Sequence, residues 1–114
     1  MKAAIAENGG FWPLVPVSHY DGHGLTDEQI VRIMNGSTPH LGATLTETAV
    51  LTRPLHGLPA TYIQCMLAGA ELDDDVAELL TSKHWRLVQM STGHWPMFSQ
   101  PRELAQILLH TVEE

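Results

Sequence analysis

His94 is the residue in this chain whose type and setting best suit it to chemistry. It follows Gly93 in a turn between residues 85–91, an apolar run typical of a strand, and a segment typical of a helix start. An imidazole on such a turn can take up and return a proton near neutral pH, as a general base does. A general base works with a nucleophile that it activates and a carboxylate that orients its ring. A catalytic His94 therefore implies two further residues.

The sequence offers weak partners for such a base. No serine stands in the Gly-x-Ser-x-Gly pattern of a nucleophile elbow. Cys65 falls inside an apolar run, where a cysteine is typically a small buried hydrophobic residue. For the carboxylate the candidates are Glu71 and Asp73, if the loop before them bends back, and we select Asp73. The three aspartates at 73–75 also suit the first turn of a helix. The predicted catalytic residues are therefore His94 and Asp73.

Large apolar side chains near the turn suggest a binding surface. Trp95 and Met97 follow His94 closely, and Trp12 lies in the Gly- and Pro-rich front of the chain. We predict that these three side chains line a pocket for a small apolar ligand or substrate. A core or interface patch is the alternative for the same residues.

A metal site is a second possibility for the front of the chain. The candidate ligands are His19, Asp21, His23 and His40. The first three alternate at a spacing that a flexible loop could fold around zinc. No fourth ligand has a clear spacing, and the aspartates at 73–75 favour a charged helix start over a calcium or magnesium site. We expect no bound metal and no cofactor.

Charge and composition narrow the partners and the location. Acidic residues outnumber basic ones by 13 to 6, which gives a net charge of −7 and disfavours nucleic acid and anionic membrane surfaces. One cysteine allows no internal disulfide, and we find no signal peptide and no apolar run of membrane-spanning length. We expect a single domain over residues 1–114, located in the cytoplasm.

The front of the chain is irregular, with one clear helix. Glycines and prolines predict a short strand or hairpin around residues 3–5 and 12–17, followed by a loop. Thr26 and Gln29 match a capping box, which predicts a helix that ends at Asn35-Gly36. Residues 37–48 are polar and irregular.

The back of the chain alternates strands and helices. Residues 60–67 and 85–91 predict two strands. A helix starts at the aspartates between them, and a last helix follows with Ser99 as its cap. The predicted buried face of this last helix comprises Leu104, Ile107, Leu108 and Val112. This βαβα pattern predicts an α/β fold with two parallel strands and helices packed on them.

Two parallel strands are too few to form a stable sheet alone. A parallel pair has to be covered on both faces and paired at its edges. Both predicted strands have the apolar composition of interior strands. We therefore expect something outside this unit to complete the sheet, and a second copy of the chain, giving a homo-oligomer such as a dimer, is the simplest candidate.

From Leu58 onward the chain resembles the C-terminal third of an α/β-hydrolase, in the branch of plant-like esterases, hydroxynitrile lyases and bacterial relatives. The matching features are the two strands, the Gly93-His94 turn and the helix after Ser99. Residues 1–48 resemble the lid of such an enzyme, and residues 49–114 resemble its last βαβα unit. The resemblance implies a partial parallel sheet with flanking helices.

The resemblance also implies that His94 matches the general base of the family. The family's acid would fall near Ala68, where residues 66–70 contain no carboxylate, and the nucleophile elbow is missing. We expect a truncated or degenerate hydrolase-like protein that is not a complete enzyme alone. The alternative is an esterase-type hydrolase of small acyl compounds, with His94 as base and the other triad members supplied by a partner chain. In a third interpretation, a separately encoded N-terminal half restores the triad.

Overall fold

Two parallel strands form the centre of the C-terminal half. In the computed structural model, which describes residues 1–67 and 71–112, β3 (Ala60–Cys65) pairs with β4 (Trp85–Met90). Ala60 lies opposite Trp85 and Cys65 lies opposite Met90. The predicted strands and their parallel order are confirmed, and each strand is slightly shorter than its apolar run.

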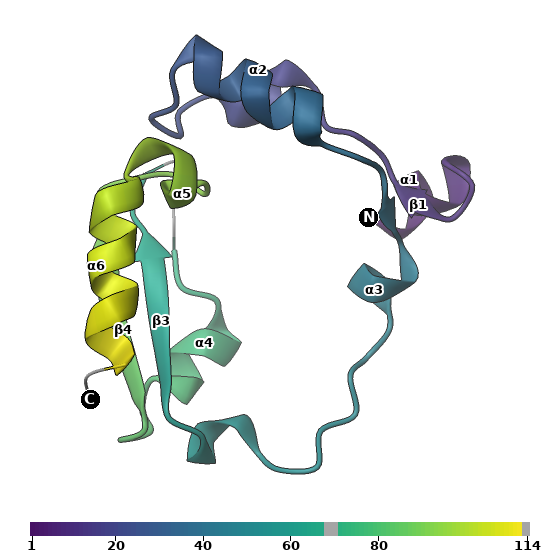
Figure 1. Ribbon diagram of the computed structural model, residues 1–114. Helices are drawn as coiled ribbons and strands as arrows, with labels where there is room; N and C mark the ends of the chain where they lie inside the picture. Colours follow the sequence, from purple (N-terminus) through teal and green to yellow (C-terminus); the bar gives the residue numbers. More distant parts are fainter. Residues whose placement is uncertain (68–70, 113–114) are drawn as a thin grey trace.

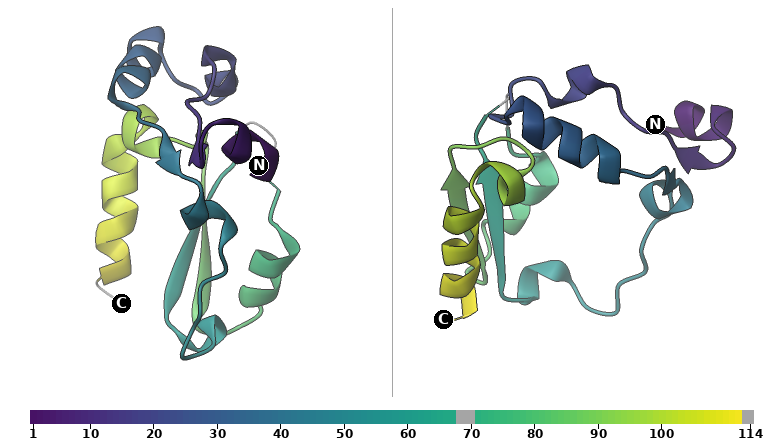
Figure 2. Two further views of the ribbon diagram at one scale, coloured as in Figure 1. Left: turned by 90° about the vertical axis from the view of Figure 1, so that its right-hand side faces the viewer. Right: turned by 45° about the horizontal axis from the view of Figure 1, so that its top comes forward.

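Three helices accompany the strand pair. The helix α4 (Asp74–Leu79) joins the two strands, and α5 (Pro96–Ser99) and α6 (Pro101–Val112) follow β4. Figure 2 shows α6 and α4 on opposite sides of the strands. The chain is therefore a mixed α/β protein, as the alternating pattern predicted.

The last helix differs from its prediction at the start. Ser99 does not cap it, because Ser99 is the final residue of the separate short helix α5. The Ser99 side chain instead hydrogen-bonds the Thr92 hydroxyl and donates to the Trp95 carbonyl oxygen at 3.3 Å. Proline at the first position of α6 sets the backbone for a new helix at residue 101.

The chain traces an open ring in Figure 1, with the strand pair and its helices on one side. The N-terminal half forms small, separate elements around the rest of this ring. In chain order these are α1 (Lys2–Glu7), β1 (Phe11–Trp12), the 3₁₀ helix η1 (Val17–Tyr20), α2 (Asp27–Gly36), β2 (His40–Leu41), α3 (Ala43–Thr46) and the 3₁₀ helix η2 (Leu55–Gly57). The predicted capping box is present at α2: the Gln29 N–H donates to Thr26 Oγ1, and the Thr26 N–H donates to Gln29 Oε1.

The prediction of a strand or hairpin at residues 3–5 and 12–17 is wrong. Residues 2–7 form a helix, because Lys-Ala-Ala-Ile-Ala-Glu is rich in the residues with the strongest helix propensity. Extended structure is confined to Phe11–Trp12, which pairs antiparallel with His40–Leu41. Residues 37–48, predicted to be irregular, contain this partner strand and the short helix α3.

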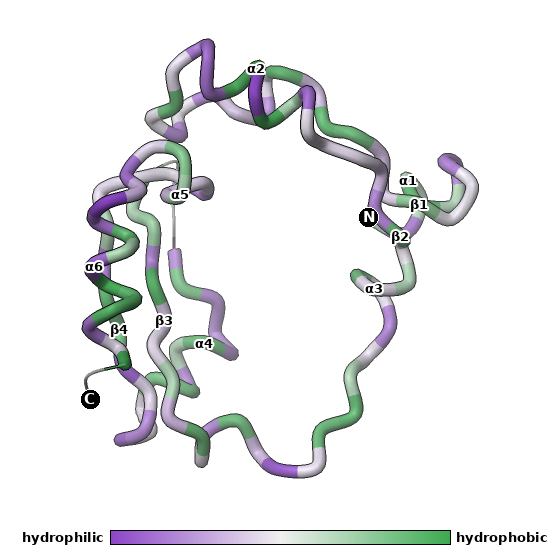
Figure 3. The backbone as a smooth tube through the Cα atoms, viewed as in Figure 1, coloured by the Kyte–Doolittle hydropathy of each residue, from purple (hydrophilic) through white to green (hydrophobic). Residues whose placement is uncertain are grey.

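The chain buries few apolar side chains. Among the described residues the buried hydrophobic side chains are Ile5, Tyr20 and Met90. The predicted buried face of α6 is wrong, because no residue of α6 is buried: Leu104 and Ile107 are half-buried, Leu108 is 51% exposed and Val112 is 81% exposed. Figure 3 shows apolar segments distributed around the open ring instead of gathered in one centre.

The exposed surface area and the radius of gyration also show that the molecule is less compact than a typical protein of its mass. The chain exposes 8536 Å², whereas a compact protein of its mass exposes about 6,200 Å². Its radius of gyration is 16.5 Å, against about 13 Å for a compact chain of this length. No helix in residues 1–67 and 71–112 is both long and apolar enough to cross a membrane.

Candidate functional site

The turn after β4 is the best-packed part of the molecule. Met90 and Thr92 are each 1% exposed, and they bracket the last residue before the turn. Gln100 Nε2 donates to the Ser91 carbonyl oxygen at 2.8 Å, so the start of α6 is tied to the end of the strand. These contacts fix the backbone that presents His94, whose own side chain is exposed.

His23 holds this turn from the other half of the chain. The Gly93 N–H donates to the His23 carbonyl oxygen at 3.2 Å, and the His94 N–H donates to His23 Nδ1 at 3.0 Å. A Cβ on Gly93 would lie 2.5 Å from both His23 Cα and His23 Nδ1, so only glycine fits at this close approach. Because Nδ1 accepts, the proton of the neutral His23 ring is on Nε2.

Trp95 lies at the centre of an aromatic cluster that joins the two halves. Its ring is edge-on to His94 at 4.9 Å and to His23 at 5.0 Å between centroids. Tyr20 lies 4.8 Å away in a tilted arrangement, and His19 lies 6.0 Å away. Contacts of this kind stabilise beyond the area that they bury, so Trp95 helps to position the His94 and His23 rings.

A groove of about 570 Å³ runs from this turn along β3. Four consecutive strand residues, 62–65, line it, together with Leu104 and Leu108 of α6. His94, Met97 and His23 line it at the turn, and so does Glu71. Imidazole and carboxylate groups therefore share one concave surface with apolar walls, the usual character of a ligand site.

The other predicted site residues are placed differently. Met97 and His94 both line the groove, whereas Trp95 contacts the His94 ring but does not line the groove. Trp12 lines a separate hollow of about 170 Å³ with Tyr20 and Met34, so the structure does not bring it together with His94. Asp73 is the exposed N-cap residue of α4 and does not line the groove, and its catalytic role stays a prediction.

The catalytic set around His94 is incomplete in the part of the chain that the structure describes. The His94 ring makes no hydrogen bond to another described residue. The position that the family resemblance gives to the acid, Ala68, lies outside the described residues. No group of His, Cys, Asp and Glu side chains within the described ranges could hold a metal ion.

Cys65 lines the groove without the properties of a ready nucleophile. Burial raises the pKa of its thiol above the usual value. The reactive form of cysteine is the thiolate, so a raised pKa lowers its reactivity at neutral pH. The interpretation of Cys65 as a small hydrophobic residue of the strand agrees with this environment.

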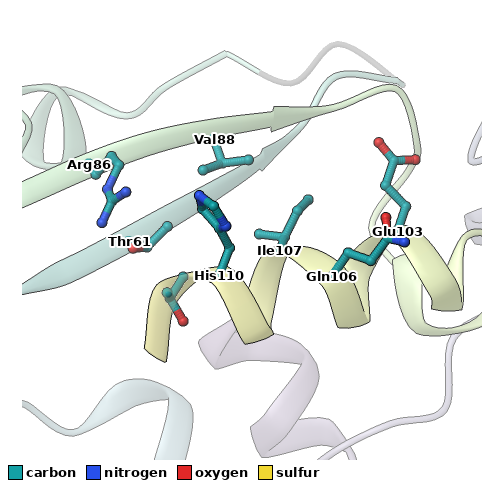
Figure 4. Close-up of a pocket in the computed structure, with 8 residues that line it drawn as sticks. Thr61, Arg86, Val88, Glu103, Gln106, Ile107 and His110 are labelled. Carbon is teal, nitrogen blue, oxygen red and sulfur yellow. The ribbon is translucent and has the colours of Figure 1, made fainter. Parts of the chain in front are cut away.

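A second hollow, of about 300 Å³, separates α6 from the strands. Val88 of β4 and Ile107 of α6 face each other across it in Figure 4, with Arg86 and His110 at one end and Glu103 at the other. The hollow shows that α6 does not pack tightly on the sheet, which agrees with the exposure of Leu108.

Sequence reasoning considered His23 only as a metal ligand and did not predict its bond to residue 94. One local signal was present in the Gly-His-Gly run at 22–24. Gly22 and Gly24 have φ values of 78° and 74°, a backbone that turns sharply on both sides of the histidine.

Comparison with known proteins gives no relative: no family model, curated protein or solved structure matches the chain.

Proposed function

We propose that the chain is an α/β-hydrolase-like module of the esterase and hydroxynitrile-lyase type that keeps the histidine turn without its own nucleophile and acid. It is not a complete enzyme alone. The observation that carries this proposal is the His94 site: a rigid backbone, an exposed imidazole at the end of an apolar groove, and no hydrogen-bonded carboxylate among the described residues. An imidazole without a nucleophile beside it has nothing to activate.

Turnover of a short-chain aryl ester tests the proposal. We expect the purified chain and His94→Ala to hydrolyse the ester at the same slow rate, because exposed imidazoles alone give only weak background catalysis. His56→Ala is the matched control, since His56 is exposed and does not line the groove. Turnover that is lost in His94→Ala and kept in His56→Ala would contradict the proposal.

One observation favours an active hydrolase as the second candidate. Glu71 lies in the same groove as His94, so a carboxylate is available on the concave surface near the imidazole. In this version His94 is the base, Glu71 or Asp73 orients it, and a partner chain supplies the nucleophile. Acyl transfer also needs an oxyanion hole, which the partner would have to provide.

A serine-directed phosphonate separates the two candidates. Mass spectrometry of the treated chain should show no labelled residue, because an unactivated serine does not react. A label on the chain or on a co-purifying polypeptide would support the hydrolase. In that case Glu71→Gln and Asp73→Asn would identify the orienting acid. Each substitution replaces a carboxylate by an amide of similar size, and only the loss of the orienting acid should abolish labelling.

A partner chain and a cytoplasmic location are part of the proposed function. The sheet is completed by a second copy of the chain or by a separately encoded N-terminal half, and the groove next to Met97 takes a small apolar ligand. The single cysteine and the acidic charge support a cytoplasmic protein that binds neither nucleic acid nor membranes.

A further inference from the structure

No strand of the described part of the chain pairs with the outer edge of β3, and the hydrogen bonds to β4 show which residues face this edge. The Ala60 N–H donates to the His84 carbonyl oxygen at 2.9 Å, and the Met66 N–H donates to the Met90 carbonyl oxygen at 2.8 Å. Successive residues of a strand direct their backbone groups to opposite edges. The even-numbered residues therefore face β4. The outward-facing residues are Thr61, Ile63 and Cys65.

This edge coincides with the groove. Side chains of successive strand residues point to opposite faces of a sheet, so no single face can be lined by residues 62–65 in sequence. A groove lined by all four runs along the edge itself. β3 also carries no charged residue and no proline, the features that protect natural edge strands from pairing.

We propose that a second copy of this chain pairs with β3 through a two-fold axis at Ile63, which makes a continuous four-stranded sheet β4–β3–β3–β4. A two-fold axis perpendicular to the sheet makes the two β3 strands antiparallel. The inference rests on the part of the proposed function in which a partner completes the sheet, and it does not depend on the chemistry of His94.

The outward-facing groups select one register. With the axis at Ile63, that residue lies opposite itself and Thr61 lies opposite the partner's Cys65, so all three outward residues exchange hydrogen bonds. A shift of two residues one way puts Cys65 opposite the partner's Pro59, which has no N–H. A shift the other way puts Thr61 opposite the partner's Leu67, whose N–H already donates to its own Thr92 carbonyl oxygen at 3.0 Å.

The exposed area fits a dimer. The chain exposes roughly 2,300 Å² more than a compact protein of its mass. A stable interface of standard size buries about 800 Å² per partner, and obligate dimers bury more. Leu108 lines the groove beside the edge, so the second copy covers apolar surface of α6 together with the strand.

The two ends of the edge also complement each other. Glu71 lines the groove at the carboxyl end of β3, whereas Arg86 and His84 line a hollow that reaches Pro59 and Ala60 at the amino end. Antiparallel pairing brings the carboxyl end of one copy to the amino end of the other. The acidic residue Glu71 of one copy then lies at the end of the edge where the other copy carries Arg86.

The molar mass in solution and a cysteine pair test the proposal. Light scattering on the purified chain should give twice 12.6 kDa. Oxidation of Thr61→Cys with diamide should then link it to the partner's Cys65, because residues opposite each other in an antiparallel pair are about 5.5 Å apart at Cα, within disulfide reach.

Tyr62→Cys is the matched control. Residue 62 lies opposite the partner's Gln64 in this register, and its side chain projects from the other face. The cross-linked dimer should be roughly tenfold more abundant for Thr61→Cys than for Tyr62→Cys. A monomeric mass, or equal cross-linking of both variants, would overturn the pairing. The ester and phosphonate assays are read separately, so a monomer would leave the proposal about His94 intact.

Discussion

At the scale of single residues, the structure fixes the backbone of His94 more firmly than its ring. Both amides of the Gly93-His94 pair donate to His23, and Trp95 packs against both histidine rings. The His94 imidazole itself lines the groove and has no hydrogen-bond partner among the described residues. A catalytic histidine would need its ring held as well, since orientation by a third group is part of the mechanism.

Gly93→Ala should destabilise the protein by about 1–3 kcal/mol, the usual cost of forcing a methyl group into a packed site. The added Cβ would meet the backbone Cα of His23 at 2.5 Å, so the two segments have to move apart and their hydrogen bonds weaken. Urea unfolding measures the loss. Gly57→Ala is the control, because a Cβ at that position meets no atom within 4 Å. Equal stability of the two variants would contradict the close packing of Gly93 against His23.

The Cys65 thiol should react slowly with iodoacetamide. Burial raises its pKa, so the folded protein carries less thiolate than the unfolded chain at the same pH, and the rate profile moves to higher pH. The same shift makes folding stability fall as the pH rises through the thiol's range, because the unfolded state ionises first. The chain in urea is the control. A folded-state rate equal to or above the denatured rate would contradict the burial of this thiol.

At the scale of elements, one glutamine links the two halves of the chain. Gln29 closes the capping box of α2, and its Nε2 donates to the Phe98 carbonyl oxygen of α5 at 2.7 Å. Arg32 of α2 lies over the Phe98 ring, 5.7 Å from its centroid. The helix α2, which was predicted from local signals, therefore also contacts the short helix that follows the histidine turn.

Thr26→Ala should cost about 1 kcal/mol, since it removes the oxygen that caps the Gln29 N–H. Thr26→Ser keeps that oxygen and should retain most of the stability. Gln29→Ala should cost more than Thr26→Ala, because it removes the reciprocal cap and the bond to Phe98 together. Thermal unfolding of the three variants gives the order, and a Gln29→Ala variant as stable as Thr26→Ser would contradict the link.

Local patterns were sufficient to predict the two strands of the back half and one helix of the front half. The strands at 60–65 and 85–90 and the start of α2 depend on short-range signals: β-branched and aromatic composition, and a capping box. The helix at residues 2–7 was not predicted. The glycines that follow it favour a turn, whereas its three alanines favour a helix.

Long-range contacts were beyond sequence reasoning. His23 and His94 are separated by 71 residues, and no periodic pattern relates them. Glu71 was a candidate acid from the sequence, but its place on the groove wall depends on the path of the chain after β3, which no local pattern predicts. The position of Trp12 also depends on such contacts, since β1 pairs with β2 and Trp12 lines a hollow separate from the groove of His94.

At the scale of the whole molecule, the chain has more surface than core. The parallel sheet in residues 1–67 and 71–112 has two strands, and independently stable sheets need three or more strands or a helix packed closely on them. The hollow between α6 and the strands shows that α6 does not supply this (Figure 4). A second copy at β3 supplies the missing strands and covers exposed apolar surface in one step.

Amide hydrogen exchange along β3 tests this account most directly. If a second copy pairs with the edge, the outward-facing N–H groups of Thr61, Ile63 and Cys65 should exchange as slowly as those of Tyr62 and Gln64, which face β4. Exchange of the three outward amides at the rate of an open strand edge, with slow exchange at Tyr62 and Gln64, would contradict it.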